Sequence, residues 1–132
     1  MTGIAVRYIV TDVDAAVAFY CDQLGFTVVM RPGPGFALLE RGALRLMLNA
    51  PGTGGAGTTV ADEVPAPGGW NRFQLQVQDL DAEVARLGAG GARLAGEIVE
   101  GKGGRQILVY DPSGNPVELF QPHPRDATAR QS

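Results

Sequence analysis

Apolar and polar residues alternate in two short stretches of the chain. The residues that follow each stretch repeat one sequence, and the two copies are 67 positions apart. Residues 4–10 and 72–77 carry β-branched or large apolar side chains at alternate positions, which predicts strands. Each stretch leads into a helical pattern headed by an aspartate that can cap it, Asp12 and Asp79. The nine residues that join strand to helix share six identities between the two copies. Two copies are too few for a solenoid, so we predict two small modules related by a pseudo-two-fold axis.

The order of the predicted elements is the same in both modules, a strand and a helix followed by three strands. A connector at 50–69, rich in Gly, Pro and Thr, is either a flexible linker or a lid over a site. The whole chain, residues 1–132, is then one α+β domain with module one at 4–49, module two at 70–121 and a tail at 122–132. The predicted strands are 4–10, 26–30, 36–40, 43–49, 72–77, 92–99, 106–110 and 116–121, with turns at 31–35 and 111–114 and helices ending at Gly25 and Leu87.

Composition excludes several classes of function. A net charge of −3 and a pI near 5 argue against binding to nucleic acid, which needs a basic face. No apolar run approaches the roughly 20 residues of a membrane helix. A single cysteine, together with an N-terminus that lacks a signal-peptide pattern, leads us to expect a cytoplasmic protein.

Two motifs carry a family resemblance. The first is V-x-D-V-D-x₄-F-Y-x₃-L-G-F, from Val10 to Phe26, and the second is D-P-S-G-N-P-V-E-L, at 111–119. In this order they resemble the glyoxalase/bleomycin-resistance/dioxygenase group, the vicinal oxygen chelate superfamily. The resemblance covers residues 4–121. It implies paired βαβββ modules, an open U-shaped mixed sheet with a cleft inside it, and commonly a homodimer.

The resemblance also implies where a metal would bind, because metal-dependent members place His, Gln or Glu at four strand positions. Here those positions hold Ala5, Arg45, Arg72 and Glu118. Only Glu118 can coordinate a cation, and a catalytic divalent site normally needs about three protein ligands. The one histidine, His123, lies beyond the last strand between two prolines. We therefore expect neither a metal nor another cofactor.

Further positions lie on the same sheet faces as these four, because residues two apart in a strand point to the same side of a sheet. Three arginines face one carboxylate there, and arginine cannot shed its charge. Either Glu118 pairs with one or two of them and water solvates the rest, or the unpaired charge receives an acidic group of a ligand. Trp70, at the rim, either packs there or stacks on that ligand. The expected ligand-binding residues are Arg7, Arg45, Met47, Asn49, Trp70, Arg72, Gln74, Gln76, Glu118 and Phe120.

These observations lead to one main hypothesis and two alternatives. The main hypothesis is a metal-free protein that sequesters an aromatic, anionic natural product or antibiotic in an Arg-rich cleft, as a homodimer with no nucleic-acid or membrane partner. One alternative is a metal-free enzyme that uses Glu118 as a general acid or base. The other is a glyoxalase-like, metal-dependent lyase, isomerase or dioxygenase.

Overall fold

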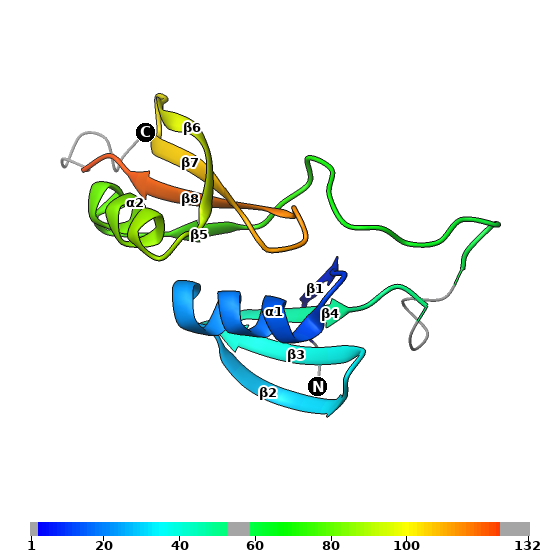
Figure 1. The fold of residues 1–132 in the computed structure, drawn as a ribbon. Coiled ribbons are helices and arrows are strands. Elements are labelled where there is room, and N and C mark those ends of the chain that lie inside the picture. The colour runs from blue at the N-terminus through cyan, green and yellow to red at the C-terminus, as the bar shows by residue number, and fades with distance from the viewer. Residues whose placement is uncertain (1–2, 53–58, 125–132) are drawn as a thin grey trace. The chain divides into compact units, whose positions relative to one another are not determined.

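The computed structural model describes residues 3–52 and 59–124. The chain has an α+β fold and forms two compact units, each built on an open four-stranded sheet (Figure 1). The first unit comprises Met1–Asn71 and Tyr110–Pro116, and the second Arg72–Val109 and Val117–Ser132. Part of the predicted connector, 53–58, and the predicted tail from residue 125 onward lie outside the described residues.

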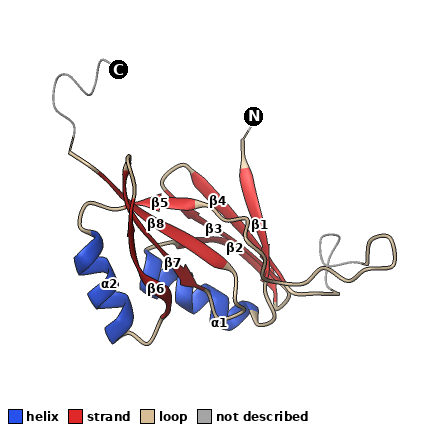
Figure 2. Cartoon of the chain, turned by 90° about the horizontal axis from the view of Figure 1, so that it is seen from above, coloured by secondary structure: helices blue, strands red, loops and turns tan. Residues whose placement is uncertain are grey.

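The sheet of the first unit has the strand order β1-β4-β3-β2. β1 runs parallel to β4, whereas β3 is antiparallel to both of its neighbours. Helix α1 lies against β3 and β4, on the face where the apolar rows of these strands are buried (Figure 2). The elements are β1 (Ala5–Ile9), α1 (Val13–Ala18), the π-helix η1 (Phe19–Gln23), β2 (Thr27–Gly33), β3 (Phe36–Arg41) and β4 (Leu44–Asn49).

The sheet of the second unit repeats this order as β5-β8-β7-β6, with β5 parallel to β8. Helix α2 lies against β6. Its N-terminus is capped twice, because Asp79 accepts a hydrogen bond from the Ala82 amide at 3.0 Å and the Gln121 side chain accepts one from the Leu80 amide at 2.8 Å. The elements are β5 (Gln74–Gln76), α2 (Leu80–Ala89), β6 (Arg93–Glu100), β7 (Gly104–Tyr110) and β8 (Pro116–Pro122).

The first helix agrees with the sequence prediction at both ends but differs in its last turn. Asp12 caps its N-terminus through the Ala15 amide at 3.1 Å, and Gly25 follows the helix with φ of 73°. The last part of the helix is the π-helix η1, and beyond it the Phe26 amide donates a hydrogen bond of 3.0 Å back to the Tyr20 carbonyl. The hydrophobic pattern did not reveal this wider turn.

Three boundaries correct the sequence prediction. The strand predicted at 72–77 is shorter in the structure and comprises Gln74–Gln76. One backbone hydrogen bond to β8 forms just before it, at Phe73, and one just after it, at Val77. The turn predicted at 31–35 is confined to its last two residues, because β2 continues through two register shifts that accommodate a proline on an edge strand. Helix α2 continues past Leu87 to Ala89, because the first glycine beyond it with positive φ is Gly91.

Within the ranges 3–52 and 59–124, no helix is both long enough and apolar enough to cross a membrane.

Candidate functional site

One face of the first sheet carries most of the site residues predicted for module one. The β1–β4 ladder pairs Ala5 with Arg45, Arg7 with Met47, and Ile9 with Asn49, so these side chains share a face. The Arg7 guanidinium donates a hydrogen bond to the Asn49 side-chain oxygen and contacts the Met47 sulfur at 3.6 Å. Asn49 is buried, which fixes one side of the Arg7 guanidinium.

Among the described residues, no carboxylate forms an ion pair with the arginines of this face. Arg45 is exposed and forms no ion pair with any described residue, and Arg7 forms none either. Glu40 of β3 is the register partner of Arg45, but no ion pair joins the two side chains. Two guanidiniums on one sheet face are therefore available to an external acceptor.

The equivalent face of the second sheet is different, because its arginine is already neutralised. The ladder places Gln74 opposite Glu118 and Gln76 opposite Phe120. Arg72 donates to one oxygen of Glu118 from Nε at 3.1 Å and from Nη2 at 2.9 Å, and Gln74 donates to the other oxygen at 2.7 Å. Glu118 is only 8% exposed. The sequence did not distinguish the three arginines. In the described structure, Arg72 forms an ion pair with a carboxylate, whereas Arg7 and Arg45 do not.

This arrangement does not fit the metal that the fold family implies. Both oxygens of Glu118 already accept hydrogen bonds from Arg72 and Gln74, and the Arg72 guanidinium would repel a cation at the carboxylate. The other positions carry side chains that do not coordinate metals, and His123 donates its backbone N–H to Gly103 while its ring lies 3.0 Å from the Gly101 carbonyl. In the described part of the chain, no three His, Cys, Asp or Glu side chains are placed to share an ion.

The two predicted aromatic residues lie in different surroundings. Phe120 is half-buried, and its ring packs beside Gly103 and Gly104 of the neighbouring strand segment, where a β-carbon on Gly104 would lie 2.8 Å from the ring. Trp70 is 76% exposed in the last part of the connector. Its predicted place at the rim of a ligand site stays a prediction.

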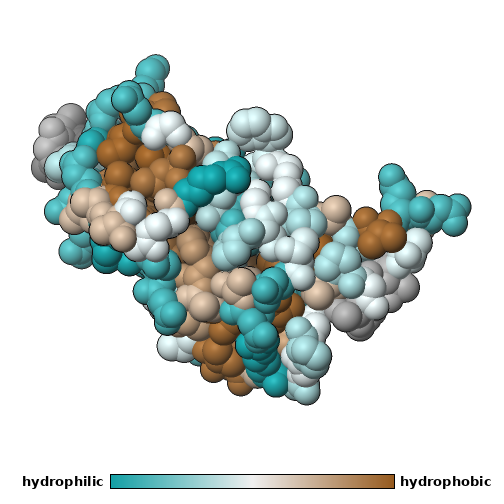
Figure 3. Space-filling model, in the orientation of Figure 1, coloured by the Kyte–Doolittle hydropathy of each residue, from teal (hydrophilic) through white to brown (hydrophobic). Residues whose placement is uncertain are grey.

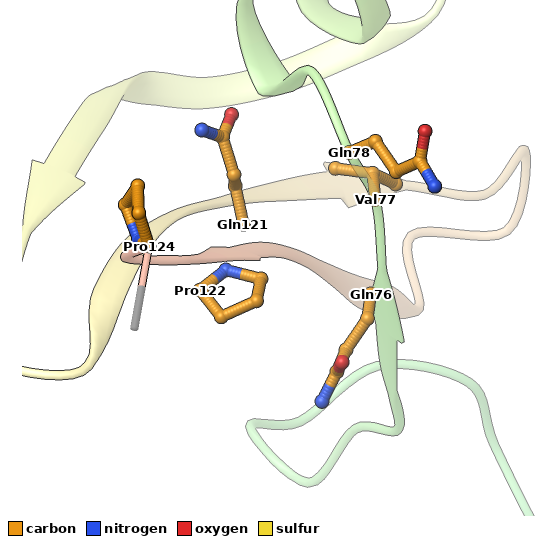
Figure 4. A pocket seen from close by; sticks show the side chains of 6 residues that line it. All are labelled: Gln76, Val77, Gln78, Gln121, Pro122 and Pro124. Carbon is orange, nitrogen blue, oxygen red and sulfur yellow. The ribbon is translucent and has the colours of Figure 1, made fainter. Parts of the chain in front are cut away.

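A pocket of about 450 Å³ lies at the carboxyl ends of β5 and β8 in the second unit (Figure 4). The prediction from sequence included only one of its residues, Gln76. Glutamines at every second position of residues 74–78 were the available signal, but the pocket also needs residues beyond β8, which only the fold brings together. Its lining residues are Gln76, Val77, Gln78, Gln121, Pro122 and Pro124.

The turn between β7 and β8 is bonded to the first of the two sequence motifs. Asp111 is buried and accepts four hydrogen bonds, two of 2.9 Å at one oxygen from the backbone amides of Ser113 and Asn115. Its other oxygen accepts from the Tyr20 hydroxyl at 2.9 Å and from the Asn115 side chain at 3.0 Å. Burial, reinforced by the Asp111 charge, raises the pKa of Tyr20 far above its ordinary value. The first motif therefore bonds directly to the second within one unit.

The sequence profile of the Glyoxalase/Bleomycin resistance protein/Dioxygenase superfamily matches residues 4–119, which contain both motifs. The chain belongs to this superfamily. Its described geometry adds that, in this member, a tyrosine–aspartate hydrogen bond connects the helix motif to the final turn.

Two solved structures and one related sequence are similar to most of the chain. The antibiotic-binding protein TnmS3 from Streptomyces sp. CB03234 is 25% identical, with a TM-score of 0.70 over 92% of this chain and 96% of its own. Lactoylglutathione lyase from Agrobacterium tumefaciens is 22% identical, with a TM-score of 0.71 over 91% and 92%, a likeness of fold alone. An uncharacterized protein of Mycolicibacterium smegmatis is 28% identical over 111 residues, 84% of this chain and 85% of that protein.

Proposed function

We propose that this protein binds and sequesters a planar aromatic natural product or antibiotic that carries an acidic group. The acidic group binds to Arg7 and Arg45 on the first sheet. The observation that carries the proposal is the pair of guanidiniums on one sheet face without an ion-paired carboxylate among the described residues.

The chemistry of this face suits such a ligand. A guanidinium stays charged at any physiological pH and presents parallel N–H donors that match a carboxylate. Met47, opposite Arg7 in the ladder and two residues along β4 from Arg45, offers a polarisable side chain that packs well against an aromatic edge. The similarity to TnmS3, an antibiotic-binding protein, supports a binding role.

The second sheet favours binding over acid–base catalysis. A general base must present a free lone pair to the proton that it removes. Glu118 is buried, and hydrogen bonds from Arg72 and Gln74 occupy three of the about four acceptor positions of its carboxylate. We therefore assign Glu118 to organising the face rather than to proton transfer.

We also propose a homodimer. Val28, Val29 and Met30 of the edge strand β2 are 48%, 47% and 48% exposed, and Figure 3 shows hydrophobic surface at the lower edge of the view, where β2 lies. An exposed apolar edge strand is normally covered in proteins that stay monodisperse. Light scattering should give about twice the 13.8 kDa chain mass. A monomer at tens of micromolar would refute this part.

The function is tested by titrating the protein with planar aromatic carboxylic acids and following the fluorescence of Trp70, the only tryptophan. The matching primary amides serve as control ligands, because they keep the ring and lose the charge. We expect saturable, stoichiometric binding of an acid, weaker binding of its amide, and no chemical change of the bound compound. Conversion of the compound into a product would refute a pure binding role.

A further inference from the structure

Asn49 lies at one end of the face of the first sheet that carries Arg7 and Arg45, called the arginine face below. It is the last residue of β4, and only 3% of its surface is exposed. It follows Arg45 and Met47 at alternate positions of β4, so its side chain points to the same side of the sheet. Arg7, which is opposite Met47, therefore lies between Arg45 and Asn49 along the strand direction.

The contact with Arg7 fixes the orientation of the Asn49 carboxamide. A guanidinium can only donate hydrogen bonds, so the oxygen of the carboxamide is the atom that faces Arg7, as the hydrogen bond between the two side chains shows. The side-chain nitrogen of Asn49 is then turned away from the guanidinium. Because the oxygen and the nitrogen share one carbon atom, this second donor still lies directly beside the Arg7 contact.

The side-chain N–H₂ group of Asn49 has no acceptor among the described residues. The oxygen is the only side-chain atom of Asn49 that forms a hydrogen bond within residues 3–52 and 59–124. In the same part of the chain, no fully buried side-chain nitrogen or oxygen lacks a hydrogen-bond partner. The N–H₂ group therefore belongs to the small part of Asn49 that reaches the surface. A nearly buried residue presents a donor there, held in one orientation.

The second sheet lacks this arrangement. Its ladder places Phe120 opposite Gln76, and the internal repeat relates Gln76 to Ile9, the ladder partner of Asn49. A hydrocarbon ring therefore stands where the first sheet has a carboxamide. The arginine of the second sheet forms an ion pair with a carboxylate, that of Glu118. The carboxamide of the first sheet instead holds an arginine without neutralising it, and it keeps one donor group for a further partner.

We infer that Asn49 is a specificity-determining residue of the proposed site. Its side-chain N–H₂ group donates a hydrogen bond to a neutral acceptor of the ligand, a ring nitrogen or a carbonyl oxygen, that lies next to the acidic group. The acidic group binds to Arg7 on the side of Arg45, and the acceptor lies on the side of Asn49. The inference rests on the proposed function and narrows the ligand class to planar aromatic acids with an acceptor beside the acidic group.

The test compares three acids of the same shape, naphthalene-2-carboxylate, quinoline-2-carboxylate and quinoline-6-carboxylate. The first has no ring nitrogen, the second has one beside the carboxylate, and the third has one on the far ring. The buffer contains EDTA, because quinoline-2-carboxylate chelates metal ions. We expect quinoline-2-carboxylate to bind about five-fold more tightly than the other two, the gain from one uncharged hydrogen bond. In ¹⁵N–¹H correlation spectra, the side-chain N–H₂ resonances of Asn49 should shift more with this acid than with naphthalene-2-carboxylate.

Two variants separate the donor from the rest of the site. Asn49→Leu removes the donor and keeps both arginines, so all three acids should bind with equal affinity. Asn49→Asp keeps an acceptor for Arg7 and replaces the donor with an oxygen that would face the ring nitrogen, so quinoline-2-carboxylate should become the weakest ligand. Each result is a ratio of affinities within one protein, so a general loss of affinity does not change it. If Asn49→Leu does not fold, the wild-type protein and Asn49→Asp still decide.

Failure of the inference and failure of the proposed function give different results. If the three acids bind to the wild-type protein with equal affinity, or if Asn49→Leu keeps the preference for quinoline-2-carboxylate, the inference is overturned and the proposed function stands. If none of the three acids binds at millimolar concentration, the proposed function fails and the inference fails with it.

Discussion

Replacing Tyr20 with phenylalanine should destabilise the protein more than the loss of one hydroxyl group suggests. Tyr20 is fully buried, its ring lies edge-to-face with Phe19 and Phe26 at centroid distances of 5.1 and 5.5 Å, and its hydroxyl donates to Asp111 at 2.9 Å. Phenylalanine keeps the ring and these contacts. The substitution therefore isolates the hydrogen bond.

The magnitude follows from the acceptor. Asp111 is 4% exposed, and without the tyrosine hydroxyl its Oδ2 keeps, among the described residues, only the Asn115 side chain as a partner. Hydrogen bonds to charged groups contribute about 1.5–3 kcal/mol, and a buried acceptor left short of partners costs at the upper end of that range. For a chain of 132 residues, about 4 °C of Tm is lost per kcal/mol, so a fall of roughly 6–12 °C is expected.

Tyr8→Phe is the matched control. Tyr8 is also buried, but its hydroxyl donates to the backbone carbonyl of Pro116 at 2.7 Å, an uncharged acceptor. Its loss should cost about 0.5–1.5 kcal/mol. Urea unfolding followed by circular dichroism measures the loss in the free energy of unfolding for both variants, and we expect the same dependence on urea concentration in both. If Tyr20→Phe costs no more than Tyr8→Phe, the buried carboxylate does not have the central structural role that we give it.

Three further predictions follow from the structure. Gly104→Ala should lower the free energy of unfolding by about 3 kcal/mol or prevent folding, because its β-carbon would lie 2.2 Å from the Gln121 carbonyl oxygen. Gly103→Ala should be tolerated in the same urea assay, because its β-carbon meets only the Phe120 ring at 3.8 Å. The pKa of Tyr20 is raised in the folded state, so its contribution to stability is complete below the unfolded pKa near 10 and is lost as the pH rises further. Absorbance at 295 nm should therefore show Tyr20 ionising only when the chain unfolds at alkaline pH. Ionisation of Tyr20 in the folded state would contradict this. Elemental analysis of protein purified without chelator should find well below one equivalent of Zn, Ni, Fe or Mn, and a stoichiometric metal would refute our interpretation of the four family positions.

Local patterns were enough to predict much of the fold. Asp12 and Asp79 cap their helices as expected, because capping depends on residues three positions apart. A leucine at every second position of residues 44–48 also predicted that Leu46 and Leu48 face the core. The short β5 and the continuation of β2 could not be predicted this way, because they depend on pairing with distant strands.

The candidate site was only partly predictable for the same reason. Alternation placed the correct side chains on each sheet face, but which arginine is neutralised depends on register. Because the β5–β8 ladder aligns Gln74 with Glu118, the carboxylate reaches both Gln74 and Arg72. No carboxylate forms an ion pair with Arg45 within the described residues, although Glu40 is its ladder partner. The alternation along a strand predicts on which face of the sheet a side chain lies, but not which side chain of another strand it contacts.

The most direct test of the account is the affinity of a bound aromatic carboxylate for three variants, measured by calorimetry. Arg45→Gln and Arg7→Gln should each weaken binding about ten-fold or more, and the loss should shrink as salt is raised. Arg86→Gln, which removes an exposed guanidinium on α2 that pairs with Glu83, should bind like wild type. If Arg45→Gln and Arg7→Gln also bind the carboxylate with wild-type affinity, the face between β1 and β4 is not the ligand site.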